Sequence, residues 1–143
     1  MMKNGATRAT WRLIDANANR ALEGLRVCED IARFYLETPL ASQHVRALRH
    51  GVGKTLEALP GQPLARLQAR ESRGDIGRRA PASRVRSIEQ SLLINFQRAK
   101  EALRTLEEAA RLVAPRSAKS FQGWRFRTYE IERELLLATV RHP

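Results

Sequence analysis

Asparagine, arginine and glutamate recur at helical spacing near the start of the chain, in NANRALEGLRVCEDIARF at residues 17–34. Asn17, Arg20 and Glu23 are each three residues apart, so on a helix they lie on one face. Arginine binds phosphate through two parallel hydrogen bonds. Such a face could therefore bind a phosphorylated compound. The alternative interpretation is a solvated surface of ion pairs, each worth about 0.2–0.5 kcal/mol.

The same pattern returns later in the chain without a gap, in NFQRAKEALRTLEEAARL at residues 95–112, where Asn95 aligns with Asn17. Nine positions are identical, and in the first stretch they are Asn17, Arg20, Ala21, Glu23, Leu25, Arg26, Glu29, Ala32 and Arg33. A single repeat favours two helices related by approximate two-fold symmetry, because a solenoid needs three or more units. Side by side, two such helices would hold arginines and carboxylates in one cleft.

Gly24 and Asn17 lie on the flank of the apolar stripe of the first stretch, and neither favours a helix interior. Glycine costs about 1 kcal/mol relative to alanine at such a position. A glycine tolerated there often permits close approach of another backbone or of a ligand. We therefore expect a close neighbour at Gly24.

A second group of charged residues lies in RESRGDIG at residues 70–77, within the longest irregular segment, residues 60–83. Arg73 and Asp75 flank Gly74, which places a cation and a carboxylate next to a backbone that can approach phosphate closely. Long loops in compact domains are more often functional or disordered than idle, and a flexible basic loop is the alternative interpretation.

The composition predicts one globular domain covering residues 1–143, with 43% apolar and 29% charged residues. The net charge of +11 attracts polyanions such as nucleic acid, anionic lipid or small phosphorylated molecules. We see no signal peptide and no apolar run of membrane length, so we expect a cytoplasmic protein without a membrane partner. The single cysteine, Cys28, should behave as a small hydrophobe.

Apolar residues at spacings of three and four predict four main helices, over about 11–36, 39–59, 84–113 and 121–140. Thr10, Thr38 and Ser83 are the expected N-terminal caps, and residues 64–69 can form a short additional helix. The inward-facing residues of the first two helices are predicted to be Ile14, Ala18, Ala21, Leu25, Cys28, Ala32, Ala41, Val45, Leu48, Val52, Leu56 and Leu59.

The predicted fold is all-α: an antiparallel bundle of four main helices, because no segment alternates with period two. An internal pseudo-two-fold repeat would relate the first and third helices. Its halves would cover about 11–59 and 84–141, joined by the loop at 60–83.

GVGKT at residues 51–55 copies the end of a nucleotide-binding P-loop, but we expect no P-loop here. The motif requires glycine where the chain has Leu48, and it must follow a β-strand, whereas this segment has a helical pattern. His50 is a lone histidine on a polar face, and such residues are more often incidental than catalytic. Cysteine and histidine show no spacing typical of a metal site.

Five segments together resemble one helical domain family: DANANRALEGLRVCEDIARF at 15–34, RH at 49–50, RESRGDIG at 70–77, NFQRAKEALRTLEEAARL at 95–112 and RFRTYEIE at 125–132. The family is a monofunctional hydroxymethylpyrimidine phosphate kinase. In many bacteria it is fused ahead of thiamine phosphate synthase, and elsewhere it stands alone, as we expect here. The resemblance implies phosphorylation of the phosphomonoester to the diphosphate with MgATP. The barrel-shaped synthase domain has no counterpart in these 143 residues, so we expect no thiamine phosphate synthesis from them.

The implied reaction suits the charged residues of the chain. Its nucleophile is an ionised phosphate oxygen, so it needs in-line positioning and charge neutralisation rather than a general base. Mg²⁺ typically takes one or two protein carboxylates together with phosphate oxygens and water. We place the site between the first and third helices, covered by residues 70–77.

The hypothesis assigns a role to each candidate residue of this site. The phosphate-binding candidates are Arg20, Arg73 and Arg98, and the magnesium candidates are Glu23, Asp75 and Glu101. Asn17 and Asn95 would bind the pyrimidine or orient these carboxylates. Arg26 and Arg104 would support the substrate site through ion pairs with Asp30 and Glu108, and His50 completes the substrate-binding candidates.

Other functions and partners stay open. A basic helical module could bind nucleic acid, but no helix carries a basic stripe free of carboxylates, which disfavours that partner. A non-catalytic domain that docks onto a separate thiamine phosphate synthase is a further alternative. A homodimer is compatible with Val27 and Phe34, which lie off the main stripe of the first helix.

Overall fold

The computed structural model describes residues 7–141, and this part of the chain contains no β-strand. The four main helices are α1 (Arg8–Asp30), α2 (Pro39–Glu57), α4 (Ile88–Val113) and α5 (Pro115–Arg141). A π-helical turn, η1 (Ile31–Tyr35), extends α1, and α3 (Leu64–Ala69) is a short helix after α2. The predicted all-α class with four main helices is confirmed. Between residues 7 and 141, none of the helices has the length and apolar character needed to cross a bilayer.

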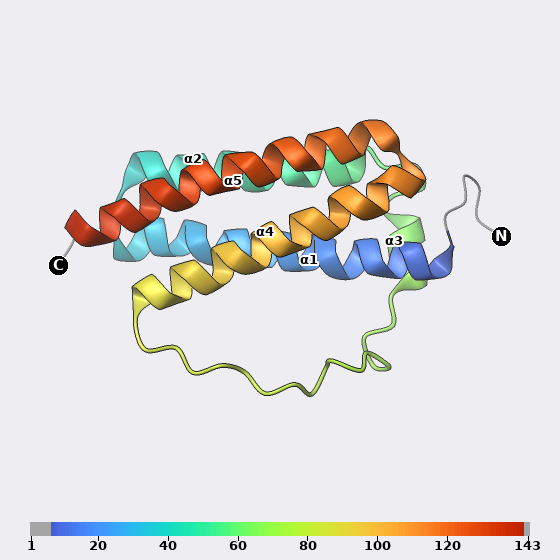
Figure 1. The fold of residues 1–143 in the computed structure, drawn as a ribbon, viewed down its shortest axis with the longest axis horizontal. Coiled ribbons are helices and arrows are strands. Elements are labelled where there is room, and N and C mark those ends of the chain that lie inside the picture. The colour runs from blue at the N-terminus through green and yellow to red at the C-terminus, as the bar shows by residue number, and fades with distance from the viewer. Residues whose placement is uncertain (1–6, 142–143) are drawn as a thin grey trace.

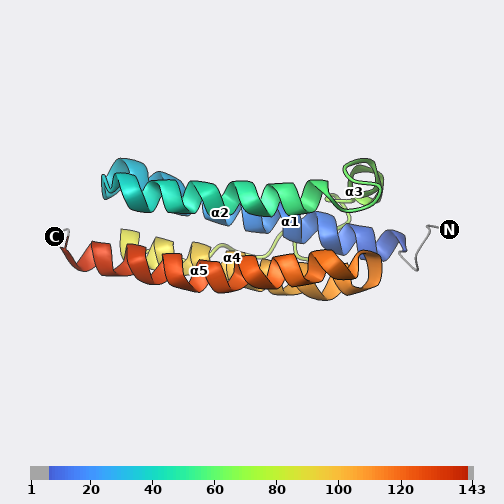
Figure 2. The same cartoon turned by 90° about the horizontal axis from the view of Figure 1, so that it is seen from above.

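The main helices form an antiparallel bundle in two layers (Figures 1 and 2). Both α1 and α5 contact α2 and α4, so α1 and α5 lie diagonally across the bundle. The short helix α3 packs against α1. Residues 70–87 then form an exposed loop that returns along the bundle to the start of α4 (Figure 1).

The predicted apolar stripes of the first two helices are confirmed, because all twelve residues are buried. Phe96 of α4 and Phe121 of α5 are the largest of the fully buried side chains, and Trp11 of α1 is almost completely buried in the same core. Cys28 is buried within α1, and burial raises the pKa of its thiol. The thiol therefore stays protonated, as expected for a small hydrophobe.

The starts of three helices differ from the sequence prediction. Thr7 rather than Thr10 caps α1, and its hydroxyl accepts a hydrogen bond from the backbone N–H of Thr10 at 3.1 Å. Ser87 rather than Ser83 caps α4, through the same kind of bond at 3.1 Å. Helix α5 begins at Pro115 rather than near Phe121, because proline suits a first helical turn as well as it ends a preceding helix.

The GVGKT segment lies inside α2, so the expectation that it is no P-loop is confirmed. Gly51 has a packing role, because a Cβ atom there would collide with the indole ring of Trp124 from α5. That indole donates a hydrogen bond from Nε1 to Oγ1 of Thr55 at 2.9 Å. These residues join α2 to α5, and the indole explains why α2 has glycine at position 51.

Candidate functional site

Helices α1 and α4 pack tightly against each other at Gly24. A Cβ atom there would lie 2.9 Å from the backbone oxygen of Asn95 and 3.7 Å from the Cβ atom of Ala99. Only glycine permits this separation of the helices, so the predicted close neighbour of Gly24 is the backbone of α4. The contact places the two similar stretches, residues 17–34 and 95–112, side by side (Figure 1).

Arg20 of α1 and Arg98 of α4 line one hollow of about 430 Å³ between the two helices, together with Asn17 and Glu101. Within residues 7–141, neither arginine has a carboxylate at ion-pair distance. Arg20 donates only a long hydrogen bond, 3.5 Å, to Oδ1 of Asn17. Both guanidinium groups are therefore available to an anion.

A second hollow, of about 710 Å³, lies between α1 and the first residues of the loop. It shares Asn17 and Arg20 with the first hollow and adds the carboxylates of Glu23 and Asp75. We name the two adjoining hollows together the α1 groove. The candidate residues that line it are Asn17, Arg20, Glu23, Asp75, Arg98 and Glu101.

Asp15 holds the start of the loop against α1. Its buried carboxylate accepts hydrogen bonds from Arg70 at 2.7 and 2.8 Å and from Arg66 at 3.1 Å. Burial would raise the pKa of this carboxyl, but the hydrogen bonds and charges of Arg70 and Arg66 outweigh burial, and the pKa is lowered. The hydrogen bond to Asp15 also raises the pKa of Arg70. The loop therefore leaves α3 from a fixed point beside the α1 groove.

The first turn of the loop is shaped by three further hydrogen bonds. Arg12 of α1 donates to the backbone oxygen of Glu71 at 2.9 Å. The carboxylate of Glu71 accepts from the N–H of Gly74 at 3.0 Å, and that of Asp75 accepts from the N–H of Gly77 at 2.8 Å. The turn brings Asp75 to the α1 groove.

Arg73 lies outside the α1 groove. It lines a neighbouring hollow of about 420 Å³ with Asp75, Arg78 and Arg79. Asp75 borders both the hollow and the groove, so Arg73 is adjacent to the groove but separated from Arg20 and Arg98. Of the three phosphate-binding candidates, the structure therefore brings Arg20 and Arg98 together and places Arg73 in the adjacent hollow.

Asn17 and Asn95 make the same contact on their two helices. Each donates from Nδ2 to the backbone oxygen four residues earlier, that of Leu13 at 2.9 Å and that of Ser91 at 2.8 Å. One amide hydrogen of each side chain is therefore engaged, and Oδ1 of Asn17 accepts the long hydrogen bond from Arg20 at 3.5 Å. Asn95 lines neither hollow of the groove.

Arg26 and Arg104 lie away from the groove. The ion pairs expected for them are present, Arg26 with Asp30 at 3.2 Å and Arg104 with Glu108 at 3.1 Å. His50 is exposed on α2 and does not line the groove. These three substrate-binding candidates are thus placed outside it.

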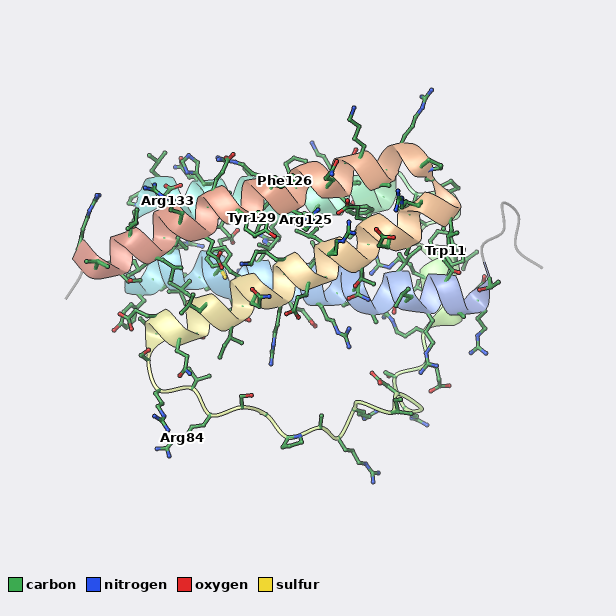
Figure 3. All side chains as sticks on the ribbon, viewed as in Figure 1. Trp11, Arg84, Arg125, Phe126, Tyr129 and Arg133 are labelled. Carbon is green, nitrogen blue, oxygen red and sulfur yellow. The ribbon has the colours of Figure 1, made fainter. Side chains whose placement is uncertain are left out.

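Two buried glutamates make interhelical ion pairs that the sequence did not predict. Glu29 of α1 pairs with Arg49 of α2 at 3.1 Å. Glu107 of α4 pairs with Arg125 of α5 at 3.0 Å, and Figure 3 labels Arg125 between these two helices, α4 and α5. The hydrogen bond that Arg125 donates to Glu107 raises the pKa of this arginine. Arg49 belongs to the motif RH and Arg125 to the motif RFRTYEIE, so these two motifs were the available sequence signal for the partners of the buried glutamates.

The described residues offer carboxylates for a metal but no complete metal site. In the part of the chain from 7 to 141, no three His, Cys, Asp or Glu side chains are grouped to hold an ion. Glu23 and Asp75 nevertheless line the same hollow. Because Mg²⁺ needs only one or two protein carboxylates when phosphate oxygens and water complete its shell, this donor set fits a magnesium ion that enters with a nucleotide.

A family model matches residues 12–134, from α1 to most of α5, and its description is the ThiD2 family. The chain belongs to the ThiD2 family. The ThiD2 match includes the α1 groove, the anchoring residues Asp15 and Arg70, and the whole of the loop.

Several curated relatives of this ThiD2 chain are named thiamine-phosphate synthase. That of Nostoc punctiforme is 35% identical over 137 residues, which cover 94% of the chain and 37% of the relative. That of Gloeobacter violaceus is 38% identical over 125 residues, which cover 85% of the chain and 35% of the relative. That of Rhodopirellula baltica is 30% identical over 139 residues, which cover 95% of the chain and 36% of the relative. The chain therefore spans little more than a third of the length of these relatives. No solved structure matches it.

Proposed function

We propose that this protein transfers a phosphoryl group from MgATP to hydroxymethylpyrimidine phosphate, giving the pyrimidine diphosphate for thiamine biosynthesis. The observation that supports this most is the pair Arg20 and Arg98, which line one groove from two helices without a carboxylate partner. The name shared by the relatives supports a role in thiamine biosynthesis, and the kinase activity itself is our proposal.

The proposed reaction joins two negatively charged phosphates. A phosphate oxygen of the acceptor forms a bond to the γ-phosphorus of ATP while the bond to the β,γ-bridging oxygen breaks, and ADP leaves. The attacking oxygen is already ionised, so no side chain has to remove a proton. The barrier arises from repulsion between the two phosphates and from the need to align them in line. Unpaired guanidinium groups lower it, because they neutralise the phosphate charge and hold the phosphates in position.

Each group of the α1 groove has a role in this proposal. Arg20 and Arg98 contact the acceptor phosphate and the transferred phosphoryl group. Glu23 and Asp75 would hold Mg²⁺, which would neutralise the nucleotide phosphates, and Glu101 is the further carboxylate candidate. Arg73 in the adjacent hollow remains a candidate for the outer nucleotide phosphates.

The pseudo-two-fold relation between the first and third helices is part of the same proposal. It is supported by contacts that recur at equivalent positions of the two stretches. The amide of Asn17 and that of Asn95 bind the backbone four residues earlier, and Glu29 and Glu107 each bind an arginine of the following main helix. A repeat of this kind would explain why the groove takes one arginine from each stretch.

An assay coupled to ADP release tests the proposal. The purified chain receives MgATP with hydroxymethylpyrimidine phosphate in one sample and with the unphosphorylated alcohol in another. The proposal expects turnover of the phosphate alone. Turnover of neither compound by folded protein would contradict it and would favour docking onto a thiamine phosphate synthase or binding of nucleic acid.

A further inference from the structure

Another concave site lies at the opposite end of α1 from the loop anchor, between the end of α1, η1 and the start of α2. Its volume is about 640 Å³, within the range of small-molecule sites. We name it the α1–α2 pocket. The charged residues that line it are Arg26, Glu29, Arg33, Glu37, Arg46 and Arg49. Four arginines thus face two glutamates.

Glu29 forms the buried part of this pocket. Its side chain is 7% exposed, and it accepts hydrogen bonds from Nε and Nη2 of Arg49 at 3.1 to 3.3 Å. Arg26 lies 3.9 Å from the same carboxylate and pairs with Asp30 as well. The negative charge of Glu29 is therefore already compensated, and its ion pair fixes the guanidinium of Arg49 in the pocket wall.

Arg33 and Arg46 carry the excess positive charge of the pocket. Within residues 7–141, neither has an ion pair with a carboxylate. The guanidinium carbon of Arg33 lies 4.7 Å from the ring centre of Phe34, a contact that leaves its N–H groups free. Like charges collected around one concavity repel each other, and a bound anion removes that repulsion.

The corresponding positions on α4 are arranged differently. The alignment of the two stretches takes Arg33 to Arg111, which pairs with Glu108 at 3.4 Å. Arg111 lies in regular α-helix, whereas Arg33 lies in the π-helical turn. The π-helical turn changes the geometry between Arg33 and Asp30, the counterpart of Glu108. Such turns are frequent at functional sites. The hollow beside Arg111 is also smaller, about 360 Å³.

We propose that the α1–α2 pocket binds a small anion with two or more linked phosphate groups, at a site separate from the α1 groove. Four guanidinium groups provide more donors than one phosphate can accept, and two of them lack any competing carboxylate. This proposal does not depend on the proposed kinase activity. A diphosphate or a nucleotide could supply the ligand chemistry, and the experiment separates the two sources.

Calorimetric titration of the full chain with inorganic pyrophosphate, and separately with ADP, tests this site. The first variant, Arg20→Ala with Arg98→Ala, removes the unpaired arginines of the groove. The second, Arg33→Ala with Arg46→Ala, removes those of the pocket. The matched control, Arg111→Ala with Lys119→Ala, makes the same change in net charge around the smaller hollow on α4. The four residues replaced in the pocket and control variants are all exposed, so we expect both variants to fold. Circular dichroism checks this.

The proposal expects pyrophosphate to bind the groove variant still, with one site per chain. The pocket variant should bind at least roughly tenfold more weakly than the control variant, as expected from the loss of bidentate contacts. Tighter binding of ADP than of pyrophosphate would identify a nucleotide as the ligand, and the reverse a simple diphosphate. Equal weakening in the pocket and control variants, or complete loss of binding in the groove variant, would overturn the proposal.

Discussion

Arg70 donates two hydrogen bonds to Asp15, from Nε to Oδ2 at 2.7 Å and from Nη2 to Oδ1 at 2.8 Å. The pair joins α1 to the first residue after α3. Both bonds are charge-assisted and the carboxylate is buried, so the pair is a firm attachment of the loop to the helical bundle. We expect this attachment to help hold Asp75 in the hollow that Arg20 also lines.

Replacing Asp15→Asn should destabilise the fold. Arg66 and Arg70 would lose their counter-charge, and we expect the free energy of unfolding to fall by about 2–3 kcal/mol. The loss stays below that of a fully buried pair because the side chain of Arg70 is 43% exposed. Urea unfolding measures it.

The control for this change is Glu130→Gln, because Glu130 and Arg127 form a surface ion pair with side chains 66% and 42% exposed. Its loss should cost less than about 1 kcal/mol. Equal destabilisation by the two substitutions would show that the Asp15 pair contributes no more than a surface contact.

The lowered pKa of Asp15 predicts a specific pH dependence. Its folded-state pKa lies below the unfolded value of about 3.9, so its contribution to stability is complete above that value. The contribution is lost as the pH falls through the folded-state pKa. The stability difference between the natural chain and Asp15→Asn should therefore be constant from about pH 5 to 7 and should decrease below about pH 4. Unfolding curves across this range give the difference, and a decrease that begins near neutral pH would contradict the assignment.

Gly24→Ala should destabilise the protein although alanine is the better helix former. Alanine favours a helix by about 1 kcal/mol over glycine, but its Cβ atom would lie 2.9 Å from the backbone oxygen of Asn95. Backbone cannot move aside locally, so α1 and α4 must separate, at a net cost of about 1–3 kcal/mol. Thermal unfolding measures the change.

Gly53→Ala is the matched control, since no atom lies within 4 Å of a Cβ atom built at Gly53. This substitution should leave the stability unchanged or raise it by up to about 1 kcal/mol. A stabilised Gly24→Ala variant would show that the helices are not held at the separation described.

Arg98→Ala should lower kcat/KM for the proposed kinase reaction on the order of 10²-fold or more, because it removes an unpaired charge that the proposal places against phosphate. Arg116→Ala, an exposed arginine at the start of α5, should leave the rate within about twofold, since surface substitutions away from a site have small effects. Steady-state kinetics of both variants make the comparison. Equal rates would remove Arg98 from the site.

The sequence predicted the features that depend on local pattern. Apolar spacing identified the buried stripes, and the unfavourable Gly24 correctly indicated a close neighbour, because only packing compensates for glycine inside a helix. The placement of Asn17, Arg20, Arg98 and Glu101 around one hollow follows from the two similar stretches lying side by side.

Asp15 was missed because its partners come from another part of the fold. The similarity of the two stretches gave no signal, since the alignment that pairs Asn17 with Asn95 takes Asp15 to Leu93. Arg66 and Arg70 are distant from Asp15 in the sequence, and only the packing of α3 on α1 brings them together. A carboxylate next to the apolar stripe of α1 was the available signal, because a buried charge requires a partner.

The observed starts of α1 and α4 differ from the predicted starts for a local reason. Thr7 and Thr10 are both suitable caps, as are Ser83 and Ser87, and sequence alone does not select between candidates one turn apart. The structure selects Thr7 and Ser87, whose hydroxyl groups accept backbone hydrogen bonds at 3.1 Å.

Phosphorus NMR of one reaction mixture tests the central claim most directly. The chain is mixed with MgATP and hydroxymethylpyrimidine phosphate, and the acceptor phosphorus is followed over time. We predict that the phosphomonoester signal falls while two mutually coupled signals of an organic diphosphate appear, alongside those of ADP. A phosphomonoester signal that stays constant in the presence of folded protein and MgATP would contradict the account.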